Sequence, residues 1–98
     1  METFNDIISS DQLVLVDFFA TWCQPCKMMH PILEQLKAAV GDKLRIIKVD
    51  VDKHNTIAAQ YRIQSVPTLM LFRNGEVLYR NSGVMDKAEL MALLEPFM

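Results

Sequence analysis

The sequence predicts an α/β fold in which a central mixed sheet of four strands has helices on both faces. Residues 13–19 are apolar at almost every position, which is typical of a strand covered on both faces. A helical pattern separates this run from a second strand-like run, 44–51, and the arrangement is typical of a right-handed βαβ unit with parallel strands. Asn74-Gly75, between two short apolar runs, is a strong hairpin signal.

The first half of the chain supplies the predicted βαβ unit and a helix before it. Residues 3–10 predict a short helix with Thr3 as its cap, because Phe4 and the isoleucines that follow fall on one face. The helix between the two strands is expected over 23–40, where apolar residues recur at helical spacing and Gly41 provides a stop.

The second half of the chain predicts a short helix, a hairpin and a final helix. The pattern over 54–61 is helical, and residues 68–72 and 77–79 are the two strands of the hairpin. Asp86, with Glu89 three residues later, resembles a capping box and opens the last helix. The resulting order α-β-α-β-α-β-β-α is expected to form a single domain over residues 1–98.

Composition and charge exclude several classes of protein. The 98 residues are 51% hydrophobic and carry a net charge of −2 with acids and bases interspersed, so nucleic acids and anionic membranes are not expected partners. No segment approaches the roughly 20 apolar residues that span a bilayer, and the first residues do not resemble a secretion signal. A lone cysteine pair fits a reducing compartment, and we expect a cytoplasmic protein and a monomer.

The two cysteines, Cys23 and Cys26, lie three positions apart where the first strand gives way to a helix. At a helix start, unpaired backbone N–H groups and the helix dipole favour a thiolate over a thiol. The thiolate is the nucleophile of disulfide exchange, and a second cysteine one turn later can attack the mixed disulfide that the first one forms. The pair is therefore predicted to be a two-electron redox site.

Three other interpretations of the cysteine pair are weaker. A zinc site needs two more ligands, and the chain offers only His30 and His54, to which we assign no function, and no second cysteine pair. Haem attachment requires a histidine directly after the second cysteine, where Lys27 stands. Two inert core cysteines would have to be buried, whereas their polar and aromatic neighbours indicate a turn that reaches the surface.

Several motifs together identify a family. Trp22-Cys-Gln-Pro-Cys-Lys27 after a Val-Asp-Phe strand, Lys48-Val-Asp50, Val66-Pro-Thr68, Asn74-Gly75 and Gly83 resemble thioredoxins in order and spacing over nearly the whole chain. The resemblance implies a protein-disulfide reductase with a reversible Cys23–Cys26 disulfide and no bound cofactor or metal. It also implies disulfide-containing client proteins and recycling by an NADPH-dependent thioredoxin reductase.

Position on the helix distinguishes the two thiols. Cys23, at the cap, is expected to reach solvent and to attack the client, because the helix terminus acts most strongly there. Cys26, one turn further, is expected to be more buried and to resolve the mixed disulfide. Pro25 lacks a donor and suits the first helical turn, where it stiffens the loop. Gln24 replaces the glycine usual in thioredoxins, so its side chain can alter the relative stability of dithiol and disulfide.

Asp17 interrupts the apolar first strand, which is costly unless its carboxyl has a partner or a task. One interpretation is a carboxylate near a strand end that reaches water. The other is a buried acid that takes the proton of Cys26, the role the resemblance implies. Lys48 is then its charge partner, or else simply an exposed lysine on the uncovered edge strand 44–51.

The resemblance also implies a surface that binds the client chain. In thioredoxin-like folds the proline matching Pro67 is cis and lies against the dithiol, and the residue before it, Val66, presents its backbone to an extended client. Trp22, Gly83 and Val84 would complete an apolar patch, in which a side chain at position 83 would block the client's approach. The alternatives are that Gly83 serves only as a turn glycine and that Trp22 only fills the core.

Two other functions remain open from the sequence. One is a binding module that uses the same scaffold to hold a partner, with redox chemistry incidental. The other is an enzyme that forms or isomerises disulfides, which a strongly oxidising redox potential would indicate.

Overall fold

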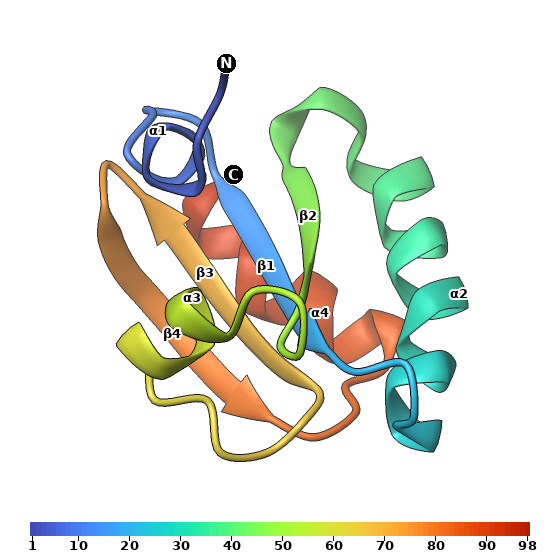
Figure 1. The fold of residues 1–98 in the computed structure, drawn as a ribbon. Coiled ribbons are helices and arrows are strands. Elements are labelled where there is room, and N and C mark those ends of the chain that lie inside the picture. Colours follow the sequence, from blue (N-terminus) through green and yellow to red (C-terminus); the bar gives the residue numbers. More distant parts are fainter.

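The computed structural model describes residues 1–98 and contains the expected four-stranded mixed sheet, with strand order β2-β1-β3-β4 (Figure 1). Strand β1 runs parallel to β2 and antiparallel to β3, and β3 pairs antiparallel with β4. The four strands are β1 (Val14–Phe19), β2 (Arg45–Asp50), β3 (Thr68–Arg73) and β4 (Glu76–Ser82). The predicted element order and the thioredoxin-like sheet are therefore confirmed.

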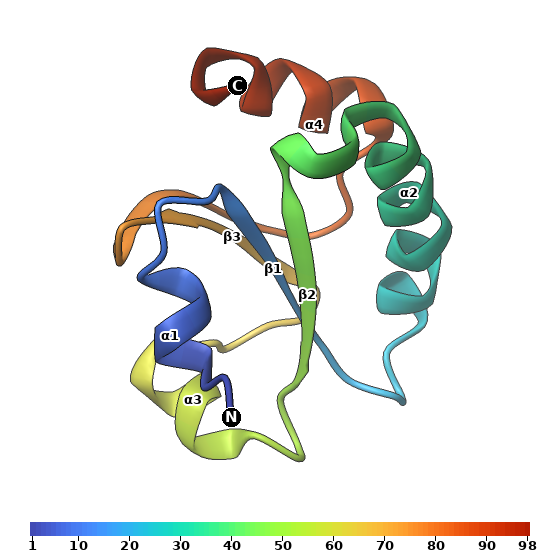
Figure 2. The ribbon, with the colours of Figure 1, turned by 90° about the horizontal axis from the view of Figure 1, so that it is seen from above.

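Helices cover both faces of this sheet, as Figure 2 shows. Helices α2 and α4 pack together on one face, and α1 and α3 lie on the other. The helices are α1 (Phe4–Ile8), α2 (Gln24–Val40), α3 (Asn55–Gln60) and α4 (Lys87–Leu94), with short 3₁₀ helices at Gly41–Lys43 and Glu95–Phe97. None of them is long and apolar enough to cross a membrane.

Strand β1 is buried on both faces because it lies between β2 and β3 under two helical layers. Val14, Val16 and Phe18 belong to the core beneath α1 and α3. Leu15 belongs to the larger core beneath α2 and α4. Successive side chains of a strand alternate between faces, so Asp17 lies on the side of Leu15, toward α2. This placement puts the one acid of the strand on the same face as the helix that carries the cysteines.

Local signals fixed the ends of several elements as predicted. Thr3 and Asp86 each form a capping box, in which the cap side chain and the acid three residues later accept one backbone N–H apiece. Asn74 and Gly75 both have positive φ, 54° and 78°, which a two-residue hairpin turn of the primed type requires.

Strand β2 is an edge strand, as expected. Its first residue, Arg45, lies on this edge and forms a bidentate ion pair with Glu2, with N–O distances of 2.7 and 2.9 Å. The strand is shorter than the predicted 44–51. The backbone N–H of Val51, just after β2, still donates to the carbonyl oxygen of Phe19 at the end of β1 at 2.9 Å.

Candidate active site

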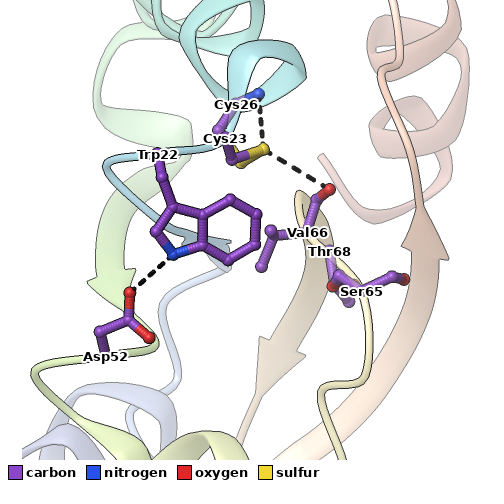
Figure 3. The surroundings of a disulfide bond; sticks show 7 residues. All are labelled: Trp22, Cys23, Cys26, Asp52, Ser65, Val66 and Thr68. Carbon is purple, nitrogen blue, oxygen red and sulfur yellow. Dashed lines mark hydrogen bonds between the residues drawn. A yellow bond between two sulfur atoms is a disulfide. The ribbon is translucent and has the colours of Figure 1, made fainter.

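Cys23 and Cys26 form a disulfide at the beginning of α2 (Figure 3). Cys23 is the N-cap residue, and its sulfur accepts a hydrogen bond from the backbone N–H of Cys26 at 3.1 Å. In most helices an oxygen of Ser, Thr, Asp or Asn caps this third N–H. Here a sulfur takes that place, so one orphan donor of the helix points directly at the predicted nucleophile.

The two cysteines are less exposed than the sequence indicated. Cys26 is fully buried, and Cys23 keeps only 3% of its surface, whereas we expected its sulfur to reach solvent. Both cysteines pack with Ala20 against the partly buried side chains of Phe19, Val51 and Val66. The surrounding loop does reach the surface, because Gln24, Pro25 and Lys27 are exposed.

Trp22 covers this region from outside and is 70% exposed. Its indole N–H donates to Asp52 Oδ2 at 2.9 Å, which holds the ring beside the disulfide (Figure 3). Trp22 also lines a shallow groove with Val51 and the segment 63–66. The sequence analysis did not single out Asp52. Asp52 lies two residues after the end of β2. The ends of the parallel strands β1 and β2 meet at one edge of the sheet, which is the signal that would have indicated it.

Val66 packs against the two cysteines and is joined to Pro67 by a cis peptide bond. The carbonyl oxygen of Val66 is 3.6 Å from Cys23 Sγ. A disulfide sulfur has no proton, so this contact becomes a hydrogen bond only when Cys23 is a thiol. Pro67 is buried, and the hydroxyl of Thr68 donates to the Ser65 carbonyl at 2.8 Å, which fixes the loop that presents Val66 (Figure 3).

Gly83 and Val84 follow β4 on the same side of the molecule as this loop. The backbone N–H of Gly83 donates to the Pro67 carbonyl at 2.8 Å. Gly83 has a φ of +103°, which side chains rarely tolerate, and nothing lies within 4 Å of the position a Cβ would take. Val84 is exposed. The structure thus brings Gly83 next to Pro67 and leaves open surface above it.

Asp17 is completely buried, and neither of its carboxyl oxygens has a hydrogen-bond partner. Burial raises the pKa of Asp17 from 3.8 to about 6, and the positive charge of Lys48 opposes this rise. The interpretation of Asp17 as a strand-end carboxylate in water is therefore wrong. A carboxyl with a pKa near neutrality can hold or release a proton under the conditions in which thiols react.

Lys48 is opposite Asp17 in the β1–β2 register but does not form an ion pair with it. Its side chain is exposed, and its Nζ lies 2.6 Å from Nδ1 of His30 on α2. The prediction that Lys48 pairs directly with Asp17 is therefore wrong. Lys48 acts on Asp17 through space, while its hydrogen bond goes to a histidine to which the sequence analysis assigned no function.

The structure contains no group of three or more His, Cys, Asp and Glu side chains arranged to hold a metal ion. His30, the nitrogen considered for a zinc site with Cys26, contacts Lys48 and packs edge-on against the ring of Phe19, at 5.7 Å between centroids. The site consists of the Cys23–Cys26 disulfide, the buried acid Asp17, and Trp22 and Val66 beside the disulfide (Figure 3).

Comparisons with known proteins agree with this geometry. The family model described as Thioredoxin matches residues 1–96. A thioredoxin of Chlamydia caviae is 48% identical over 93 residues, covering 95% of this chain and 89% of its own, and a thioredoxin-like protein of Synechocystis is 47% identical over 91 residues, covering 93% and 87%. A solved structure of thioredoxin-2 from a malaria parasite superimposes with a TM-score of 0.84 at 30% identity, covering 87% of this chain and 82% of that one.

The fold and the disulfide at the start of α2 define a thiol–disulfide oxidoreductase with protein-disulfide reductase activity. With the family model covering nearly all of its residues, the chain belongs to the thioredoxin family.

Proposed function

We propose that this protein reduces disulfides in client proteins, with Cys23 as the attacking thiol and Cys26 as the resolving thiol. The observation that carries the assignment is the hydrogen bond from the Cys26 N–H to Cys23 Sγ. A hydrogen bond to an ionised acceptor is roughly twice as strong as one to a neutral acceptor. The same N–H therefore stabilises a Cys23 thiolate after reduction more than it stabilises the thiol.

In the first step the Cys23 thiolate attacks one sulfur of the client disulfide. The Cys23–client bond forms, the client S–S bond breaks, and the client's other sulfur leaves as a thiolate that takes a proton. We expect the client chain to lie on the side of the Val66 carbonyl, because this carbonyl is close to Cys23 Sγ. Because Cys23 is nearly buried, the client sulfur has to approach along the rim of Trp22, Val66 and Val84.

In the second step Cys26 attacks the Cys23 sulfur and releases the reduced client. Cys26 is fully buried, so its proton has to go to a group inside the protein. The Asp17 carboxylate, buried toward α2, is the proposed acceptor. Its raised pKa is closer to the pKa of a thiol than that of an ordinary carboxyl is, so it can take the proton of Cys26 more readily. The products are the Cys23–Cys26 disulfide and a client dithiol, so two electrons have passed from the protein to the client.

Client recognition is assigned to backbone and apolar contacts around the disulfide. An extended client can pair with the backbone of Val66 in the manner of an added strand. Trp22, Pro67, Gly83 and Val84 form its apolar surroundings, and Gln24 and Pro25 present the loop that carries the sulfurs. The groove along Trp22 and residues 63–66 supports this assignment.

We also place the protein in a reducing compartment, the cytoplasm, as a monomer. There an NADPH-dependent thioredoxin reductase would return the two electrons to the Cys23–Cys26 disulfide, as the family membership supports. The chain itself needs no bound cofactor, because both electrons are stored in its sulfurs.

The test is an insulin reduction assay coupled to NADPH oxidation by a thioredoxin reductase. Sustained turnover, with a redox potential near that of reducing thioredoxins, about −270 mV, is the expected result. A potential near that of strong oxidants, about −120 mV, would instead indicate an enzyme that forms disulfides. Binding to a partner without any turnover would indicate a binding module.

Trp22→Ala is expected to weaken client binding. Removing this exposed aromatic side chain beside the disulfide should raise the KM for insulin reduction about five- to tenfold. Reduction of a small aromatic disulfide, which makes few rim contacts, should change much less. Met28→Ala is the matched control, because Met28 is also exposed, at 58%, but lies further along α2. Equal effects of Trp22→Ala on both substrates would contradict the assignment.

A further inference from the structure

His30 contacts Lys48, whose charge acts on Asp17, but the proposed mechanism gives His30 no function. It lies on the sheet-facing side of α2, one helical turn after Cys26, and is partly buried. Its ring packs edge-on against Phe19 of β1, which fixes the orientation of the imidazole. Its Nδ1 lies 2.6 Å from Lys48 Nζ of β2.

The chemistry of this contact determines the state of the ring. A lysine ammonium has three donors and no acceptor, so Nδ1 of His30 has to be the acceptor. The ring is then neutral and carries its proton on Nε2. Partial burial, and after it the charge of Lys48, lower the pKa of His30, while Glu34 acts in the opposite direction. Both leading influences favour the neutral ring that the hydrogen bond needs.

We propose that His30 is a positioning residue that holds the Lys48 ammonium at a fixed place beside buried Asp17. The inference rests on the proposed function of Asp17 as the proton acceptor for Cys26. Lys48 is exposed, and nothing else in the structure accepts a hydrogen bond from its Nζ. A free lysine side chain samples many rotamers and is fully solvated in water. Held by His30, its charge stays close to the carboxyl that it stabilises.

The charged groups that act on this arrangement are few. Lys48 is the one charge that acts appreciably on Asp17, and Lys48 and Glu34 act on His30. On the other side of β1, the neighbour of Asp17 in β3 is Leu69, which has no charge. A change in the position of Lys48 should therefore appear directly in the titration of Asp17.

The experiment is a carbon-13 NMR titration of the Asp17 carboxyl in the oxidised protein. His30→Leu keeps the bulk of the ring but removes the acceptor, and the midpoint of the titration should rise by about half a pH unit or more. His30→Asn offers an acceptor oxygen close to the position of Nδ1 and should restore the midpoint to that of the wild type. His54→Leu is the control, because His54 makes no side-chain hydrogen bond at the start of α3.

A double-mutant comparison shows whether His30 acts through Lys48. In a Lys48→Met background, His30→Leu should leave the Asp17 midpoint unchanged. A shift of the same size with and without Lys48, or no shift or a downward shift in the single variant, would overturn the proposal. Nitrogen-15 shifts of the wild-type imidazole provide a test that needs no variant: an Nε2–H tautomer is expected, and an Nδ1–H tautomer would overturn the proposal.

Kinetics separate this proposal from the one on which it rests. If Asp17 is the proton acceptor, Asp17→Asn slows release of the client from the mixed disulfide. His30→Leu then moves the acidic limb of the pH profile of that step upward by the same amount as the NMR midpoint. An unchanged release rate in Asp17→Asn would refute the function of Asp17 as acceptor, whereas the NMR titration would still decide whether His30 positions Lys48.

Discussion

Cys23→Ser is expected to abolish insulin reduction, by about a thousandfold or more, because the hydroxyl that replaces the thiol cannot form the mixed disulfide. Cys26→Ser should be equally inactive in turnover for a different reason. Its Cys23 can still attack the client, but no second thiol remains to release it. The Cys26 variant should therefore accumulate a covalent client adduct that the Cys23 variant does not form.

Mass spectrometry of the two variants after mixing with oxidised insulin checks this prediction. The adduct should disappear on addition of dithiothreitol, since it is held by one S–S bond. Neither variant can form the Cys23–Cys26 disulfide, so a comparison of their free energies of unfolding serves as the control for folding. An adduct formed by the Cys23 variant, through Cys26, would reverse the assigned order of the two thiols.

Asp17→Asn is expected to make the protein more stable at neutral pH and no more stable at low pH. Asp17 has a pKa raised from 3.8 to about 6, so the folded protein binds a proton more tightly than the unfolded chain. Wild-type stability is then lost as the pH rises from about 4 to about 6, and the shift corresponds to about 3 kcal/mol. Asparagine has nearly the same shape and never ionises, so the variant should lack this loss.

Urea denaturation of the oxidised proteins from about pH 3.5 to about pH 8, a range that extends to both sides of the shift, checks the prediction. The free energies of unfolding of wild type and Asp17→Asn should converge at the acidic end and separate by up to about 3 kcal/mol above pH 7. Asp11→Asn, at an exposed aspartate, should run parallel to the wild type. A constant difference between Asp17→Asn and the wild type would show that Asp17 is not buried as a proton-binding acid.

The proposed function of Asp17 explains why a destabilising acid can persist in a buried strand. A carboxyl without any hydrogen-bond partner costs free energy whenever it ionises. The same burial raises the proton affinity of Asp17, which the proposed function as proton acceptor for Cys26 requires. Stability is commonly sacrificed at functional sites in this way.

Local sequence signals predicted most of the fold because each depends on a few adjacent residues. The unbroken apolar run of β1, the capping boxes at Thr3 and Asp86, and the positive-φ turn at Asn74-Gly75 each specify a conformation without knowledge of the rest of the chain. Strand ends were less accurate, since the first and last residues of β2 depend on what their neighbours in β1 offer.

The site was predictable in its residues but not in its contacts. The spacing of Cys23 and Cys26 and the acid in an apolar strand can be found in the sequence. Whether Lys48 turns to Asp17 or to His30 depends on side-chain rotamers across the packing of α2 on β2, which no periodicity encodes. The near-complete burial of Cys23 likewise results from a loop 43 residues away, at Val66.

The start of α2 is expected to make Cys23 a thiolate near neutral pH, and alkylation of the reduced protein by iodoacetamide as a function of pH measures this ionisation. Peptide mapping assigns the modified cysteine. We expect Cys23 to react first, and its rate to reach half of its maximum at least about one pH unit below the value of about 8.5 for an unperturbed cysteine. A Cys23 profile that coincides with that of free cysteine would contradict it.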